Sequence, residues 1–137
     1  MPRIRFAALE DIPDVVALWS RAAGPTRHAG GLTEVRQLLR HDPESLLVAE
    51  EEDRIVGTVI AGWDGWRLHL YRLAVAPAAR RSGVATALVA GARKRASSLG
   101  AVRLDAMVDV ENAGAAAFWE DAGFELDARE RRWSLRV

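Results

Sequence analysis

Short runs of apolar residues, several of them alternating with polar ones, predict the strands of this chain. The runs lie at residues 3–7, 45–50, 54–62, 67–75 and 102–108, with a final hairpin near residues 124–126 and 132–137. The acidic residues 51–53 separate two of these runs and predict a hairpin turn. Trp133, Leu135 and Val137 alternate along the last run, so the pattern predicts about seven strands.

Four other stretches carry apolar residues at helical spacing. The predicted helices run from Asp11 to about residue 23, from Thr33 to about residue 40, over residues 84–99, and over residues 112–122. Asp11 and Thr33 are suitable N-caps, and Gly100 is suited to end the third helix. The order β-α-α-β-β-β-α-β-α-β-β predicts an α/β fold with a mixed central sheet and helices on both faces.

Composition narrows the class of protein without naming a function. The length of 137 residues predicts one domain over residues 1–137. Nineteen basic and nineteen acidic side chains give no net charge, which argues against a nucleic-acid partner. The chain has no cysteine, so disulfides and thiolate metal sites are excluded. No cluster of His, Asp or Glu has metal-ligand spacing, so we expect no metal.

Targeting and membrane signals are absent from the sequence. No run approaches about 18 apolar residues, and the N-terminal residues 1–5 lack the apolar core of a signal peptide. We therefore expect a soluble cytoplasmic protein with no membrane partner.

Residues 73–86 carry the strongest chemical signal in the chain. They form the end of an apolar strand, a turn at Pro77, and a basic glycine-containing loop that opens a long helix. Gly83 lets a ligand approach the backbone, and the first helical turn offers N–H groups that favour an anion. With Arg80 and Arg81 beside it, the loop predicts a phosphate-bearing cofactor. Its spacing matches neither the P-loop nor the GxGxxG pattern.

Two motifs, taken together and in this order, resemble those of the GNAT (Gcn5-related) N-acetyltransferase superfamily. The segment Leu73-Ala74-Val75, then Pro77, then Arg80-Arg81-Ser82-Gly83-Val84-Ala85 is similar to the acyl-coenzyme A-binding motif of that family. Residues 112–124 are similar to the family's Asn-x-x-Ala-x-x-Phe-Tyr-x-x-x-Gly-Phe. The resemblance covers nearly the whole chain, which most resembles the small single-domain bacterial members of YpeA-like type.

The resemblance implies the fold, the cofactor and the residues that bind it. In this fold the strands carrying residues 73–75 and 102–108 splay apart, and the pantetheine arm of acetyl-CoA, the acyl donor, lies in the gap. Backbone N–H groups of residues 81–86 would hold the pyrophosphate. The implied cofactor-binding residues are Leu73, Ala74, Val75, Arg80, Arg81, Ser82, Gly83, Val84, Ala85, Thr86, Asn112, Ala115, Phe118 and Trp119. Asn112 is also a good helix N-cap, and Ala115 and Phe118 are equally suited to ordinary core packing.

Trp119 departs from the family pattern. Many members have a tyrosine there, which protonates the departing coenzyme A thiolate. An indole N–H does not titrate usefully, so Trp119 can donate a hydrogen bond or pack but cannot serve as that acid. Tyr71 is the only tyrosine in the chain and is a candidate replacement.

His69 is the candidate general base. It stands four residues before Leu73, where the histone-acetyltransferase branch of the family has a glutamate, and imidazole titrates near neutral pH. Because side chains alternate along a strand, His69, Tyr71 and Leu73 are expected on one face. A half-exposed strand histidine with no catalytic role fits the same position, and Glu50 and Asp64 are weaker candidates for the base.

The acceptor and the assembly are less well specified. Residues 24–32, the turn at residues 63–66 and the final hairpin are expected to build the acceptor pocket, for an amine of a small molecule or a protein. Family habit permits a homodimer. The sequence therefore predicts an acetyl-CoA-dependent N-acetyltransferase; the alternative is a non-catalytic acyl-CoA-binding regulatory module.

Overall fold

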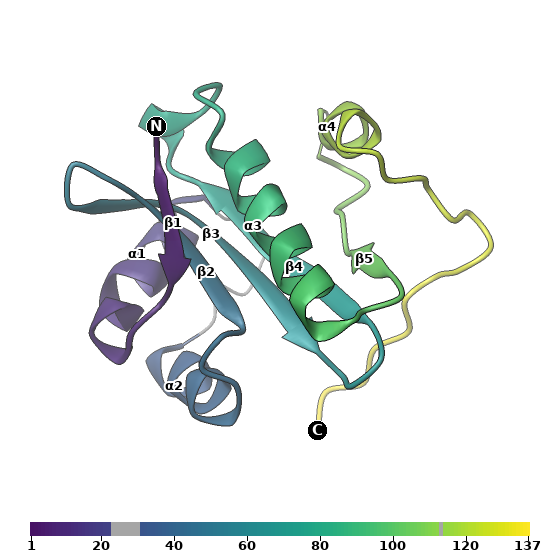
Figure 1. Cartoon of the computed structure of the whole chain (residues 1–137), viewed down its shortest axis with the longest axis horizontal. Coiled ribbons are helices and arrows are strands. Elements are labelled where there is room, and N and C mark those ends of the chain that lie inside the picture. The colour runs from purple at the N-terminus through teal and green to yellow at the C-terminus, as the bar shows by residue number, and fades with distance from the viewer. Residues whose placement is uncertain (23–30, 113) are drawn as a thin grey trace. The chain divides into compact units, whose positions relative to one another are not determined.

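The computed structural model describes residues 1–22, 31–112 and 114–137, and divides into two compact units, Met1–Met107 and Val108–Val137 (Figure 1). The single domain expected over residues 1–137 stays a prediction. In order, the elements are β1 (Arg3–Phe6), a 3-10 turn η1 (Leu9–Asp11), α1 (Ile12–Ala22), α2 (Leu32–His41), β2 (Leu46–Glu51), β3 (Arg54–Trp63), β4 (Leu68–Val75), a 3-10 turn η2 (Pro77–Ala79), α3 (Val84–Leu99), β5 (Leu104–Ala106) and α4 (Ala115–Asp121).

The first unit is built on one sheet with the strand order β1-β2-β3-β4-β5. Neighbours from β1 to β4 pair antiparallel, whereas β4 and β5 are parallel, so the predicted mixed sheet is confirmed. The predicted hairpin between β2 and β3 is also present. Its two turn residues, Glu52 and Asp53, have positive φ values of 50° and 61°. Two-residue hairpin turns need positive φ at both positions to match the right-handed twist of the flanking strands.

Helices cover both faces of this sheet, as predicted (Figure 1). Val48 and Ile60 belong to the core under α1 and α2. Leu47, whose side chain points to the opposite face, lies beside Gly91 of α3. The apolar runs in β2 and β3 are continuous rather than alternating because both of their faces are buried.

The prediction of about seven strands is wrong, because five are present in the described residues. The expected hairpin near residues 124–126 and 132–137 does not form strands in the second unit. Alternation stabilises a strand only when one face is buried against a partner. Trp133 and Leu135 are 93% and 87% exposed, so the alternation has no buried face there.

Two predicted N-caps are also wrong. The carboxylate of Asp11 accepts a hydrogen bond from the N–H of Ala8 (2.7 Å), at the start of η1, and pairs with Arg5 (2.7 Å). α2 begins at Leu32 after Gly31, so Thr33 lies inside the helix. Gly100, with φ of 74°, ends α3 as predicted. The predicted end of the first helix lies outside the described residues.

The second unit contains α4, which is shorter than the helix predicted over residues 112–122. Its N-cap is Gly114, and the backbone carbonyl of Asn112, rather than its side chain, accepts hydrogen bonds from the N–H groups of Gly114 and Ala115. Gly123, with φ of 93°, follows the end of the helix. No helix in the described parts of the chain is long and apolar enough to cross a membrane.

Candidate active site

The loop between β4 and α3 has the backbone conformation that an anion site at a helix start requires. Arg81 (φ 65°) and Gly83 (φ 84°) are both left-handed, and the hydroxyl of Ser82 donates to the carbonyl of Ala79. The N–H of Ala87 bonds to the carbonyl of Gly83 (3.0 Å), so the N–H groups of the preceding residues 84–86 have no acceptor within the helix. A Cβ on Gly83 would meet no atom within 4 Å, so a ligand has room to approach.

A close contact between α3 and β3 fixes the position of this loop. A Cβ on Gly57 would lie 2.6 Å from Val84 Cγ1 and 3.0 Å from Leu88 Cδ1. Gly57 is also the register partner of Val75, the last residue of β4. The absence of a side chain at Gly57 therefore lets the first turn of α3 lie directly beside the end of β4.

The outer edge of β4 is open over its second half. β4 pairs with β5 only from Leu68 to Leu70, and the last bond on that side is from the N–H of Met107 to the carbonyl of Leu70 (3.1 Å). Within residues 1–107, the part of β4 from Tyr71 to Val75 pairs with β3 alone. The N–H of Ala76 bonds to Val56 of β3 (2.8 Å), so the N–H of Val75 points to the open edge.

A β-bulge interrupts β4 just where its edge becomes open. Tyr71 pairs with Ile60 and Ala74 pairs with Thr58, so Arg72 and Leu73 together oppose one residue of β3. Arg72 has φ of 55°, which is unusual for a residue with a side chain. His69 and Tyr71 precede the bulge and share a face of the sheet, as predicted. The bulge reverses the alternation after Tyr71, so Leu73 lies on the opposite face, and its predicted assignment to the face of His69 and Tyr71 is wrong.

Buried side chains hold the bulge in place. The hydroxyl of Thr58 donates to the carbonyl of Arg72 (3.0 Å) and accepts from Nε1 of Trp19 (2.8 Å). The guanidinium of Arg72 lies 4.9 Å from the centroid of the Trp19 ring. Thr58 and Trp19 are buried, with 0% and 3% exposure. Sequence reasoning missed both residues, because neither belongs to a local motif and only the tertiary fold brings them to β4.

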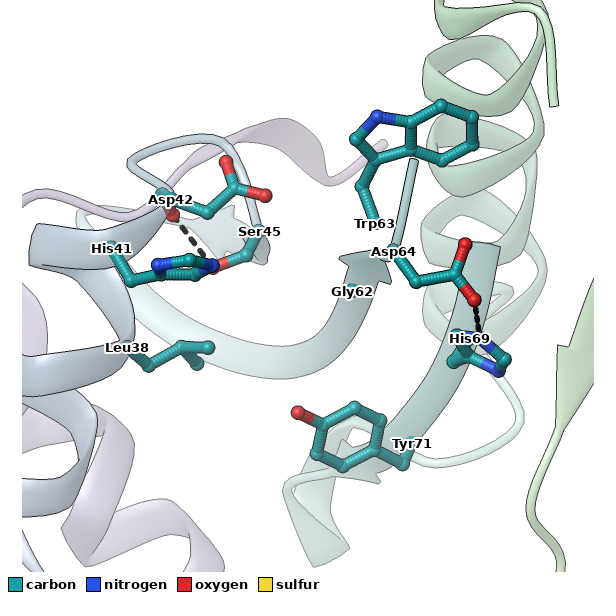
Figure 2. Close-up of a pocket in the computed structure, with 9 residues that line it drawn as sticks. All are labelled: Leu38, His41, Asp42, Ser45, Gly62, Trp63, Asp64, His69 and Tyr71. Atoms are coloured by element: carbon teal, nitrogen blue, oxygen red, sulfur yellow. Dashed lines mark hydrogen bonds and ion pairs between the residues drawn. The ribbon is translucent and has the colours of Figure 1, made fainter. Parts of the chain in front are cut away.

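A cavity of about 320 Å³ lies on the α1 and α2 side of β3 and β4, next to the start of the open edge (Figure 2). It is lined by Leu38, His41, Asp42, Ser45, Gly62, Trp63, Asp64, His69 and Tyr71. The turn predicted at residues 63–66 therefore contributes to the lining. The predicted contribution of residues 24–32 falls largely on residues 23–30, outside the described residues.

His69 and Asp64 form a pair at this cavity, with His69 Nε2 2.8 Å from Asp64 Oδ2 (Figure 2). Asp64 Oδ1 also accepts from the backbone N–H groups of Arg67 (2.6 Å) and Trp66 (2.8 Å). These three hydrogen bonds, that from Arg67 first, lower the pKa of Asp64 to about 2. Because an ionised carboxylate only accepts, Nε2 carries the proton and the basic lone pair of a neutral ring is on Nδ1.

Tyr71 stands on the same face of β4, two residues after His69. Its side chain is 40% exposed, and the burial of the rest raises the pKa of the phenol above its usual value. The phenol therefore keeps its proton at neutral pH and serves as a hydrogen-bond donor.

In the second unit, Trp119 is packed among aromatic rings. Its ring centroid lies 5.2 Å from that of Phe118 and 4.9 Å from that of Phe124, and both pairs are edge-to-face. Ala115 is buried at the start of α4. The cofactor roles expected for Asn112, Ala115, Phe118 and Trp119 in this unit stay predictions. The other predicted cofactor-binding residues, Leu73–Val75 and Arg80–Thr86, lie in the first unit, on consecutive parts of β4, the loop and α3.

Among the described residues, no group of three or more His, Asp or Glu side chains is arranged to hold a metal ion. The candidate site has three parts, which are the open edge of β4, the loop before α3, and the cavity with its His69–Asp64 pair.

Comparison with known proteins agrees with this geometry. Residues 12–124 match the Acetyltransferase (GNAT) family. An acetyltransferase from Yersinia pestis (strain Pestoides F) is 33% identical over 122 residues, which cover 89% of this chain and 86% of that protein. The structure of a ribosomal-protein-alanine N-acetyltransferase from Brucella melitensis matches with a TM-score of 0.77 and 28% identity, covering 90% of this chain and 84% of that one.

A further structure, AAC(6')-Iy in complex with the bisubstrate analogue CoA-S-monomethyl-acetylneamine, matches with a TM-score of 0.81. It covers 100% of this chain and 99% of that one at 19% identity, so it shows a shared fold alone. The chain belongs to the GNAT family of acetyltransferases. The GNAT-like α/β fold is confirmed.

Proposed function

We propose that this protein is an acetyl-CoA-dependent N-acetyltransferase that moves an acetyl group to an amine by direct attack. The observation that carries the proposal is the continuity of the open edge of β4, from Tyr71 to Val75, with the left-handed loop at the start of α3. This arrangement supplies backbone donors for an extended amide-containing chain, followed at once by a site for its phosphates.

The pyrophosphate of acetyl-CoA would bind at the start of α3. The N–H groups of residues 84–86 point out of the helix end, whose dipole adds about half a positive charge. Arg80 and Arg81 flank this end and are exposed. The pantetheine arm would then lie along β4 as an added strand, with the backbone groups of Leu73 and Val75 toward its amides.

The N–H of Val75, which points to the open edge, is the proposed donor to the thioester carbonyl. As the amine nitrogen attacks, negative charge develops on that oxygen, and a fixed backbone donor stabilises it. The C–N bond forms, the C–S bond breaks, and the electron pair leaves with the coenzyme A sulfur. The attacking nitrogen then loses its remaining extra proton to the thiolate, which gives a neutral amide and a free thiol.

The amine must lose a proton before it can attack. For an amine of lysine type with a pKa of about 10.4, deprotonation at pH 7 costs roughly 4.6 kcal/mol. His69 is the proposed base, directly or through a water, because the hydrogen bond to Asp64 keeps the proton on Nε2 and leaves Nδ1 to accept. Tyr71, with its raised pKa, would donate a hydrogen bond to the thiolate rather than transfer its proton completely.

A calorimetric titration with acetyl-CoA tests the cofactor assignment with a matched pair of variants. Gly83 and Gly100 both have positive φ, both have open space around the missing Cβ, and both cap α3, at opposite ends. Gly83→Val should abolish binding, whereas Gly100→Val should bear the same backbone strain and retain the wild-type affinity. Equal affinity in the two variants would refute the assignment of the loop.

The alternative function is a non-catalytic acyl-CoA-binding module. The packing of Trp119 against Phe118 and Phe124, at the position where many family members carry an acidic tyrosine, favours it. Such a module would bind acetyl-CoA in the same titration but release no thiol with any amine.

A further inference from the structure

We propose that the cavity beside β4 is the acceptor site and that it selects a compact primary amine with one positive charge and an apolar or aromatic body. This inference rests on the proposed function, and it goes further by naming the class of acceptor. His69 and Tyr71 line the cavity, and Tyr71 begins the open edge that would hold the thioester. An amine in the cavity would thus approach the thioester from the α1 and α2 side of the sheet.

The walls of the cavity are largely apolar. Leu38 of α2 forms one side, and the aromatic ring of Tyr71 contributes from β4 (Figure 2). Gly62 forms part of the floor, where a Cβ would lie 3.7 Å from Tyr71 Cε1. Such walls favour an apolar or aromatic body and offer a polyhydroxylated ligand few hydrogen-bond partners.

The charges at the cavity sum to about one negative charge when the imidazoles are neutral. Asp42 is neutralised by Arg95, whose Nη2 lies 2.7 Å from its Oδ2. Arg95 is only 8% exposed, and its Nη1 also donates to the carbonyls of Glu44 and Ala61 (2.6 Å each), so this pairing is fixed by the fold. Asp64 keeps its charge, because its pKa is lowered to about 2. The single charged carboxylate of Asp64 can balance one ammonium group. A polycation would bring further positive charges for which the cavity has no negative partner.

The size of the cavity also favours a small acceptor. A volume of about 320 Å³ is at the lower end of ligand pockets. A phenylalkylamine fits within this volume, whereas an aminoglycoside or a protein segment would extend beyond it through the open side of the cavity.

Two variants close the cavity from opposite walls without touching the cofactor loop. Gly62→Leu places a side chain from β3 into the cavity, and the glycine φ is not in the left-handed region. His41→Trp fills it from the end of α2, where the side chain is exposed and the fold tolerates a larger residue. Arg40→Trp is the matched control, because Arg40 is the exposed neighbour of His41 on the same helix and is not part of the lining.

The experiment measures amine binding and acetyl transfer separately. Phenethylamine, spermidine, the aminoglycoside kanamycin and a lysine-containing peptide are titrated by calorimetry, and each is then assayed with acetyl-CoA. We expect phenethylamine to bind saturably and to have a kcat/KM at least tenfold above the other three. Gly62→Leu and His41→Trp should weaken phenethylamine binding at least tenfold, while Arg40→Trp should change it less than twofold.

The acetyl-CoA affinity of each variant separates the two proposals. If acetyl-CoA binds but phenethylamine does not, or if a polyamine, aminoglycoside or peptide is the best substrate, the inference on the acceptor is refuted and the proposed function stands. Unchanged phenethylamine binding in both cavity variants would refute it too. If acetyl-CoA does not bind, the proposed function fails, and the amine titrations still decide whether the cavity is an amine site.

Discussion

Replacing Thr58 by valine tests whether the buried hydrogen bonds at β4 hold the bulge at Arg72 and Leu73. Valine has nearly the shape of threonine, so the substitution removes the hydroxyl with little change in packing. The hydroxyl donates to the Arg72 carbonyl (3.0 Å) and accepts from the Trp19 indole (2.8 Å), so both partners lose a hydrogen bond at once.

The expected magnitude follows from the burial of these groups. Thr58 is fully buried and Trp19 is 3% exposed. A buried polar group left without a partner costs about 1–3 kcal/mol. Two such groups give an expected destabilisation of about 2–6 kcal/mol for Thr58→Val, unless β4 rearranges to satisfy them. Rearrangement would move Leu73 and Val75, whose backbone groups are proposed to bind the pantetheine arm, and would raise the KM for acetyl-CoA.

Urea unfolding monitored by tryptophan fluorescence gives the stability, and initial rates give the KM. Thr58→Ser is the control, since it keeps the hydroxyl and loses only a methyl group, at a cost of about 1 kcal/mol. The acetyl-CoA KM of Thr58→Ser should stay near that of the wild type, while that of Thr58→Val rises about tenfold, as expected if about 1.4 kcal/mol of binding is lost. If valine is no more destabilising than serine and both leave the KM unchanged, the role assigned to this hydroxyl is refuted.

Three further outcomes are expected. Gly57→Ala should lower the free energy of unfolding by about 1–3 kcal/mol, because its Cβ would overlap the side chain of Val84; unchanged denaturant midpoints would contradict the close packing. Arg5 lowers the pKa of Asp11, so their pair stabilises the fold above the unfolded carboxyl pKa of about 3.9, and this stability is lost as pH falls through the lower folded value. Asp11→Asn should therefore be destabilised at pH 7, and its difference from the wild type should shrink as the pH falls below about 3.9; a constant difference across that range would contradict the assignment. His69→Ala should remove an ionisation from the acidic side of the kcat/KM profile against pH, and an unaltered profile would exclude His69 as the base.

Local signals in the sequence predicted the parts of the site that depend on a short stretch of chain. The turn at Pro77, the glycine at position 83 and the helix start at Val84 are adjacent in sequence, and the first turn of a helix is an anion site wherever it occurs. The hairpin turn at Glu52 and Asp53 is equally local. Such features need no knowledge of what packs against them.

The features that were missed depend on contacts between distant residues. The bulge at Arg72 is held by Thr58 and Trp19, which lie 14 and 53 positions earlier in the chain. Nothing in the alternation of β4 marks the reversal, so the face of Leu73 was assigned wrongly. The pairing of His69 with Asp64 depends on the turn between β3 and β4, which aims the carboxylate back at the strand. Alternation at the C-terminal end predicted strands that have no buried face in their own unit.

Product analysis is the most direct test of acetyl transfer to an amine. The protein is incubated with acetyl-CoA and phenethylamine, and samples quenched over time are analysed by mass spectrometry for the acetylated amine and by a thiol assay for free coenzyme A. We expect both to appear together in equal amounts and neither to appear with Gly83→Val. Acetyl-CoA that binds but yields no thiol with this or any other amine in a broad panel would contradict acetyl transfer and favour a regulatory module.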